Sequence, residues 1–218
     1  MNKKDMFFGI SAGLLIGLLA LPVLRTAKPA LHAQYWWAIV PLFLIATPLG
    51  LYIAYLIGRK ISVVWQIGKF GVIGVLNTLV DWGVLAVLFA VGPCWFGVGT
   101  EQALVAMGAA TITVYTIYKA ISFIIANINS YYWNKSWTFA RSLAQKTKAE
   151  FLQFFAVSLV GFLLNVGIAS YVFKAIDPVT NMNVDQWGLV GAAIGSIVGL
   201  AWNFLGYKFI VFKETIVA

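Results

Sequence analysis

Six long apolar stretches constrain the fold of this chain more than any other feature of its sequence. Each is close in length to the roughly 20 residues that a helix needs to cross the hydrocarbon core of a bilayer. Charged residues make up only 10% of the chain, which is too few to cover the surface of a water-soluble domain. We therefore predict an all-α fold, a polytopic membrane helical bundle. The expected transmembrane helices are residues 6–24, 37–57, 67–90, 114–134, 151–173 and 187–207.

The distribution of positive charge predicts how the helices are oriented. Lysines and arginines gather in the loops on the cytoplasmic side of membrane proteins. If both termini are cytoplasmic, only Arg25, Lys28 and Lys174 are left outside, and Lys119 falls within a span. This asymmetry accounts for the net charge of +8 without a nucleic-acid partner. We expect a multi-pass protein of the cell (inner or plasma) membrane.

An internal repeat relates the third and fifth spans. The stretch FGVIGVLNTLVDWGVLAVLF (residues 70–89) aligns with FFAVSLVGFLLNVGIASYVF (residues 154–173), and the alignment places Asp81 opposite Asn165. The spans that follow agree in their last turns, where NKSWTF aligns with YKFIVF. Each unit contains two spans, so both units enter the membrane in the same sense, and the repeat is parallel.

These boundaries divide the chain into two expected parts. A transmembrane helical hairpin at residues 1–60 precedes a four-helix domain at residues 66–213, whose repeat units are about residues 66–139 and 150–213. Residues 93–113 lengthen the connection inside the first unit. We expect them either to lie along the membrane surface or to extend the fourth helix.

Polar residues follow one face of the third and fourth spans. Asn77 and Asp81 are four residues apart, so they share a helix face. A carboxyl group at the centre of a span costs about 2.5–3.5 kcal/mol on insertion scales, so it requires a compensating partner or a function. The fourth span carries Lys119, Ser122 and Asn129. We expect Lys119 to be the only cation buried within a span and Asp81 to be the only acid there. Either they pair with each other, or each faces a polar cavity that takes a substrate.

The predicted cytoplasmic ends of the two repeat units combine amides, aromatic rings and one lysine each. The first end holds Asn134, Lys135 and Trp137, and the second holds Asn203 and Lys208. One interpretation is interfacial anchoring, with lysines that extend toward water. The other is a docking surface for a lipid phosphate and a sugar, because lysine binds phosphate as a point charge and aromatic rings stack on sugar faces.

The sequence lacks the residue sets of most enzyme sites. With one histidine and one cysteine, the chain offers no nucleophile–histidine–acid set and no Cys/His cluster for a metal. It also has no glycine-rich phosphate loop and no pair of catalytic carboxylates. We expect a protein that is not an enzyme and that uses no cofactor and no metal.

These motifs together resemble the GtrA-like family. The similarity covers about residues 66–213, and its most specific parts are the N-x-x-x-D pattern at Asn77 and Asp81, Lys119, and the NKSWTF ending at Phe139. Members of that family are small four-helix proteins implicated in moving polyprenyl-phosphate-linked monosaccharides across the membrane. Related modules are fused to polyprenyl-phosphate mannosyltransferases. The resemblance implies a translocase or accessory protein for a lipid-linked sugar, with two added spans at the N-terminus.

Three functions are then open. The first is a flippase that moves a polyprenyl-phosphate-linked monosaccharide from the cytoplasmic to the outer leaflet for surface glycan glycosylation, with the prenyl tail left in membrane lipid. The second is a non-transporting anchor that recruits a glycosyltransferase through a basic patch of Lys135, Arg141, Lys146 and Lys148. The third is a small channel or solute exporter. A homodimer is compatible with each. The residues expected to bind the flippase substrate are Asn77, Asp81, Lys119, Ser122, Asn129, Asn134, Lys135, Trp137, Asn165, Asn203 and Lys208.

Overall fold

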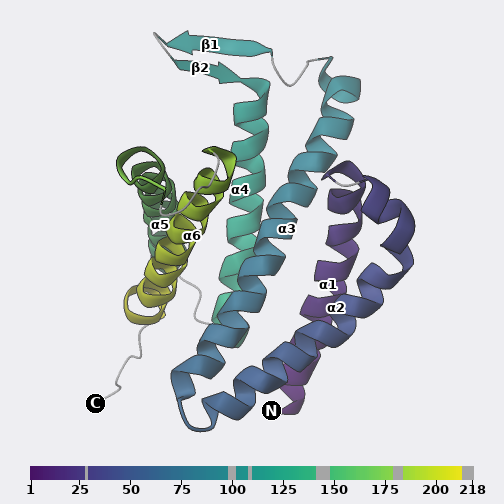
Figure 1. Ribbon diagram of the computed structural model, residues 1–218, viewed down its shortest axis with the longest axis vertical. Coiled ribbons are helices and arrows are strands. Elements are labelled where there is room, and N and C mark those ends of the chain that lie inside the picture. The colour runs from purple at the N-terminus through teal and green to yellow at the C-terminus, as the bar shows by residue number, and fades with distance from the viewer. Residues whose placement is uncertain (28, 98–101, 108–109, 141–147, 179–183, 213–218) are drawn as a thin grey trace. The chain divides into compact units, whose positions relative to one another are not determined.

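Helices dominate the computed structural model, which describes all residues except 28, 98–101, 108–109, 141–147, 179–183 and 213–218 (Figure 1). Each predicted span falls on one helix, and most helices extend beyond the predicted apolar segment. Their bounds are α1 (Lys3–Ala27), α2 (Pro29–Gly58), α3 (Ser62–Phe96), α4 (Val114–Trp133), α5 (Lys148–Ala175) and α6 (Val184–Gly206). Two five-residue π-helices, η1 (Asn134–Thr138) and η2 (Tyr207–Val211), continue α4 and α6.

The chain divides into two compact units, Met1–Ala140 and Arg141–Ala218. The first contains α1 to α4 and η1, and the second contains α5, α6 and η2. The N-terminal hairpin and the first repeat unit therefore form one compact body.

Small residues allow α1 and α2 to approach closely. Gly9, Gly13 and Gly17 recur every four residues along α1, and all three are buried. A Cβ atom at Gly13 would lie 2.5 Å from Phe43 O, and one at Gly17 would lie 2.8 Å from Val40 Cα. Helix backbones come this near only where no side chain separates them, which is a common basis of helix association in membranes.

The second helix is long and bent. It contains Pro41 and Pro48, and Figure 1 shows α2 curving along its length. Proline removes a backbone hydrogen bond and bends a helix, and membrane helices tolerate this where neighbouring groups satisfy the freed carbonyls. Leu51 of α2 packs with Ile73 of α3 and Trp137 of η1 in a buried apolar cluster. This cluster joins the N-terminal hairpin to the first repeat unit.

A two-stranded antiparallel sheet connects α3 to α4. Its strands are β1 (Ala103–Met107) and β2 (Ala110–Thr113), with Met107 opposite Ala110. Of our two expectations for residues 93–113, the extension of the fourth helix is wrong, because α4 begins at Val114; a position along the membrane surface stays a prediction. The end of α3 takes up the first of these residues, and the two strands include most of the others that the structure describes. Strand pairing satisfies the backbone groups of a connection that has left the helices.

The second unit is built on the contact between α5 and α6. The two backbones approach each other closely at Gly199, where a Cβ atom would lie 2.9 Å from Gly161 O. Phe154 stacks on Tyr207 of η2 with ring centroids 4.2 Å apart, and the hydroxyls of Ser158 and Tyr207 share a hydrogen bond of 2.6 Å. Aromatic stacking and this hydrogen bond together fix η2 against α5.

Both repeat units end in the same backbone feature. Phe139 N donates to Asn134 O at 2.9 Å, and Phe212 N donates to Tyr207 O at 2.7 Å. The alignment of NKSWTF with YKFIVF pairs these two donors and these two acceptors. Because π-helices are rare, their occurrence at aligned positions supports the internal repeat.

Four of the described helices are long and apolar enough to cross a membrane. They are Lys3–Arg25, Pro29–Gly58, Ser62–Gly92 and Lys148–Ile168. The region of α6 and η2 adds a shorter apolar stretch, Ile197–Val211. Together with the helix packing in each unit, these segments confirm a helical membrane bundle; among the described helices, the predicted fourth span, α4, is not one of those apolar enough to cross a membrane.

Candidate functional site

A polar stripe follows the interface between α3 and α4. Ser122 Oγ donates a hydrogen bond of 2.7 Å to Asp81 Oδ1. Ser122 is fully buried and Asp81 is partly buried. Lys69 Nζ, twelve residues before Asp81, donates to Trp137 O at the other end of the interface, so the two helices are antiparallel. The structure thus brings two of the predicted site residues into contact.

Two amides on this stripe have a buried polar atom without a hydrogen-bond partner in the described part of the chain. These atoms are Asn77 Oδ1 on α3 and Asn129 Nδ2 on α4. Leaving a buried donor or acceptor unpaired costs about 1–3 kcal/mol, so each such atom calls for an explanation, such as an absent water or ligand. The side chain of Lys119 lies outside the described residues.

Each repeat unit places a lysine over the aromatic ring four residues before it. Lys135 Nζ lies 5.6 Å from the centroid of the Tyr131 ring and donates to Tyr131 OH at 3.3 Å. Lys208 Nζ lies 5.8 Å from the centroid of the Phe204 ring. The negative face of an aromatic ring attracts a cation. Lys135 is 1% exposed, whereas Lys208 is partly exposed. A ligand in the surroundings can therefore reach Lys208 more readily than Lys135.

Asn134 and Trp137 are also interior residues. Asn134 Nδ2 donates to Ser130 O at 2.9 Å. Trp137 is 1% exposed, and its ring stacks on Phe8 of α1 with centroids 5.5 Å apart. In the first unit α1 covers the indole ring and Asn134 is fully buried, so neither group lies at the surface in this structure; a docking role for this end stays a prediction.

In the second unit, Asn165 and Asn203 lie at the crossing of α5 and α6. A Cβ atom at Gly199 would lie 3.1 Å from Asn165 Cβ, and one at Gly161 would contact the amide of Asn203. Asn203 Oδ1 is buried and has no hydrogen-bond partner among the residues that the structure describes. Within the described residues, each repeat unit therefore holds a buried amide atom without a hydrogen-bond partner between its two helices.

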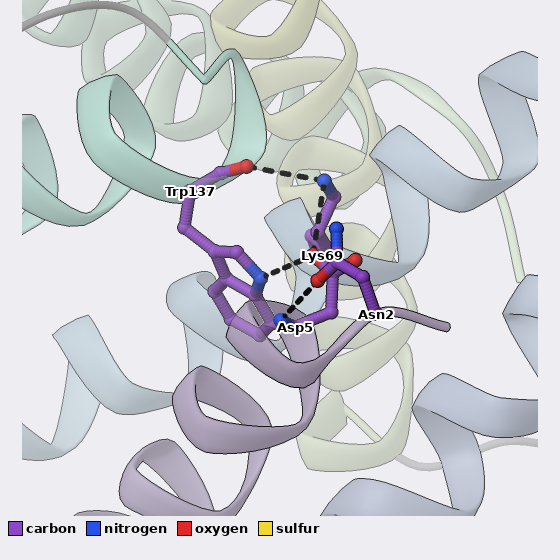
Figure 2. A network of polar contacts seen from close by, with 4 residues as sticks. All are labelled: Asn2, Asp5, Lys69 and Trp137. Carbon is purple, nitrogen blue, oxygen red and sulfur yellow. Dashed lines mark hydrogen bonds and ion pairs between the residues drawn. The ribbon is translucent and has the colours of Figure 1, made fainter.

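A charged network joins α1, α3 and η1 at one end of the first unit (Figure 2). Trp137 Nε1 donates to Asp5 Oδ1 at 3.0 Å, and Lys69 Nζ donates to Trp137 O at 3.1 Å. Lys69 Nζ lies 3.8 Å from Asp5 Oδ1. Asp5 N donates to Asn2 Oδ1 at 2.7 Å, which caps the start of α1. Trp137 thus holds a carboxylate of α1 and an ammonium group of α3.

This network was not predicted from the sequence. The expectation that Lys119 is the only cation buried within a span is wrong, because Lys69, in the predicted span of residues 67–90, is 7% exposed. Asp5 and Lys135 lie just outside the predicted spans and are 8% and 1% exposed. One signal was present: Asp5 is the only acidic residue that precedes Asp81. The predicted orientation also places it on the same membrane face as Lys69.

The side chains at these sites can bind a ligand through hydrogen bonds and through charge. Among the described residues, no group of three or more His, Cys, Asp or Glu side chains could hold a metal ion. The interface of α3 and α4 offers amides, a hydroxyl and a carboxyl group. Such groups bind sugar hydroxyls, while the ammonium groups at the end of the unit suit an anion.

Comparison with known proteins identifies the family. The family model of the GtrA/DPMS transmembrane domain matches residues 69–212. A relative from Bacillus subtilis (strain 168), described as the uncharacterized membrane protein YngA, is 26% identical over 151 residues, which cover 69% of this chain and 81% of the relative. No solved structure matches the chain. Since the family model covers more than half of the sequence, the protein belongs to the GtrA/DPMS transmembrane domain family and is a multi-pass membrane protein.

Proposed function

We propose that the protein is a flippase that moves a polyprenyl-phosphate-linked monosaccharide from the cytoplasmic to the outer leaflet of the cell membrane, with both termini cytoplasmic. Membership of the family associates the chain with polyprenyl-linked sugar processes. The proposed role is transport rather than catalysis. It requires a polar path through the bilayer for the head of the lipid, while the prenyl tail stays in the hydrocarbon.

The observation that carries the proposal is the set of unpaired polar atoms beside the Asp81–Ser122 hydrogen bond. Asn77 Oδ1 and Asn129 Nδ2 are buried within helices that pack against each other. A bundle selected for stability alone gains nothing from them, because each carries a desolvation cost. A sugar replaces the hydrogen bonds of water with bonds to such groups as it enters the membrane.

These groups are of the kinds that a sugar requires. A sugar hydroxyl both donates and accepts, so Asn77 Oδ1 takes a hydroxyl proton and Asn129 Nδ2 donates to a hydroxyl oxygen. Asp81 accepts from a hydroxyl more strongly than a neutral group does, since an ionised acceptor strengthens the bond. The unpaired Asn203 Oδ1 offers a corresponding acceptor in the second unit.

The test is translocation by purified protein in liposomes that carry a polyprenyl-phosphate sugar in both leaflets. An impermeant sugar-oxidising reagent outside reports the fraction of lipid that becomes accessible with time. Wild-type protein should expose the inner pool. Asn77→Leu should lose transport while its free energy of unfolding stays equal to or above that of wild type, because the variant removes an unpaired buried oxygen.

The matched control is Asn127→Leu on α4. Asn127 Nδ2 donates to Phe123 O in its own helix. The variant therefore removes a buried amide but leaves Asn77 Oδ1 and Asn129 Nδ2 unaltered. It should transport as wild type does. Folded wild-type protein that leaves the inner pool untouched would refute the flippase proposal.

The alternative of a glycosyltransferase anchor has less structural support. Of its expected basic patch, Lys135 is 1% exposed, and Arg141 and Lys146 lie outside the described residues. Lys148 is exposed at the start of α5. Failure of the transport assay, with a glycosyltransferase bound to the protein, would favour this alternative.

A further inference from the structure

We propose that Lys69 Nζ and Trp137 Nε1 form a binding site for the phosphate group of a lipid, and that Asp5 occupies this site as an internal competitor. The identity of the lipid as the transported substrate rests on the proposed function. The site itself rests on the polar contacts of Asp5, Lys69 and Trp137 shown in Figure 2.

Two strong donors converge on one anion in this network. Trp137 Nε1 donates to Asp5 Oδ1 at 3.0 Å, and Lys69 Nζ lies 3.8 Å from the same oxygen. The side chains of Lys69 and Asp5 are 8% and 12% exposed. A carboxylate and a phosphate present similar oxygens to such donors, and both gain from being held by a cation and an N–H group away from water.

The ammonium group of Lys69 is incompletely paired with Asp5. It can donate three hydrogen bonds, and in the described part of the chain it makes one, to Trp137 O at 3.1 Å. The distance of 3.8 Å to Asp5 Oδ1 is longer than the roughly 2.7–2.9 Å of a charge-assisted hydrogen bond. A phosphate, with more oxygens than a carboxylate, can bond to Lys69 and to the indole N–H at the same time.

The donors and the anion come from different parts of the chain. Lys69 and Trp137 lie within the matched family domain, residues 69–212, whereas Asp5 lies in the segment that precedes it. Asp5 is also not needed to cap its own helix, because Asn2 Oδ1 accepts the hydrogen bond from Asp5 N. Its carboxylate is directed instead at the indole N–H group of the domain.

Asp5 can leave the phosphate site without the unfolding of the rest of α1. The helix begins at Lys3, so Asp5 lies in the first turn, and helix ends open at far lower cost than helix interiors. The contacts that oppose this include the bonds of Asp5 to Trp137 and Lys69 and the packing of Phe8 on Trp133 and Trp137. An aromatic pair is worth about 0.5–1.5 kcal/mol beyond its buried area. Exposed Lys3 and Lys4 flank the site, and their charge attracts an anionic headgroup.

The experiment measures equilibrium binding of radiolabelled polyprenyl phosphate to the purified full-length protein in detergent. Asp5→Asn keeps the side-chain shape and an oxygen acceptor but removes the competing charge. If the site is free of Asp5 in about a tenth of the molecules, this variant should bind about tenfold more tightly. Asp177→Asn, at an exposed position after α5, is the matched control and should bind as wild type does.

Lys69→Met distinguishes this site from other lipid sites on the protein. It should weaken binding in the wild-type chain and should abolish the gain of Asp5→Asn in the double variant. A role of Asp5 in stability alone predicts no gain in affinity. Equal binding by wild type and Asp5→Asn, with gel filtration showing both folded, would overturn the proposal, as would tight binding by the double variant.

Two further measurements are needed. One distinguishes a lipid phosphate from free phosphate, and the other distinguishes failure of the phosphate site from failure of the flippase proposal. Neutral polyprenol should show no gain with Asp5→Asn, and millimolar inorganic phosphate should not displace the lipid; displacement would overturn the assignment to a lipid. Tighter binding by Asp5→Asn without any translocation by wild type would sustain the site and refute the flippase. If translocation depends on Asn77 but lipid binding is unchanged by Asp5→Asn and Lys69→Met, the flippase proposal would stand and the phosphate site would be refuted.

Discussion

The close approach of α1 and α2 at Gly13 gives a quantitative prediction for Gly13→Ala. The added Cβ atom would lie 2.5 Å from Phe43 O and 3.2 Å from Thr47 Cβ. The nearest atom is a backbone oxygen, which cannot rotate away as a side chain does. Relief therefore requires α1 to move by about 0.9 Å, which brings the contact to the 3.4 Å at which ordinary contacts begin.

The expected cost follows from this displacement. Overpacking a tight interface by one methyl group typically costs about 1–3 kcal/mol. In water, part of that would be offset by the helix propensity of alanine over glycine, about 0.5–1 kcal/mol. In a bilayer or micelle, α1 stays helical when it separates from α2, so most of this offset is absent. We expect Gly13→Ala to lower the free energy of unfolding by about 1–3 kcal/mol.

The assay is equilibrium unfolding in mixed micelles with increasing denaturing detergent, followed by tryptophan fluorescence. Gly50→Ala is the matched control, because Gly50 lies on α2 with no atom within 4 Å of its added Cβ. It should change the free energy of unfolding by less than about 0.5 kcal/mol. The same midpoint for Gly13→Ala and wild type, or the same shift in both variants, would refute the packing argument.

Further predictions concern the second unit and the indole N–H. Gly199→Ala should destabilise the protein by about 1–3 kcal/mol in the same unfolding assay, whereas Gly167→Ala, which meets no atom within 4 Å, should be neutral. Tyr207→Phe should cost about 0.5–1.5 kcal/mol through loss of its hydrogen bond, and a double-mutant cycle with Ser158→Ala should show coupling; additive effects would contradict the bond. Trp137→Phe should cost about 1.5–3 kcal/mol, because it removes a donor to a carboxylate, and an unchanged unfolding midpoint would count against that contact.

Much of the fold could be predicted from periodicity and composition. A helix in lipid must satisfy its own backbone groups, so an apolar run of the right length has few alternatives. The contact between Asp81 and Ser122 follows from the same logic, since polar residues at helical spacing turn toward a neighbouring helix rather than toward lipid. The repeat was visible because its two copies keep the aromatic and lysine positions of their last turns.

Local patterns could not predict the β-hairpin or the charged network. The strands are made largely of small and β-branched residues in an apolar run, which reads equally well as helix or strand. Asp5 and Lys69 are 64 residues apart in sequence, and each looks like an ordinary charge at the end of a span. Lysines near helix ends usually extend toward water, so only the packing of α1 on Trp137 reveals that Lys69 and Lys135 are buried.

The appended hairpin makes two similar units unequal. Both units end in a π-helix that carries a lysine over an aromatic ring. In the first unit, α1 places Phe8 and Asp5 against Trp137, and Lys135 is sealed from its surroundings. In the second, Lys208 remains partly exposed. Of the two aligned lysines, a lipid phosphate that approaches the protein therefore has access to Lys208 but not to Lys135. It reaches Lys69 and the indole N–H group of the first unit only when the first turn of α1 has moved.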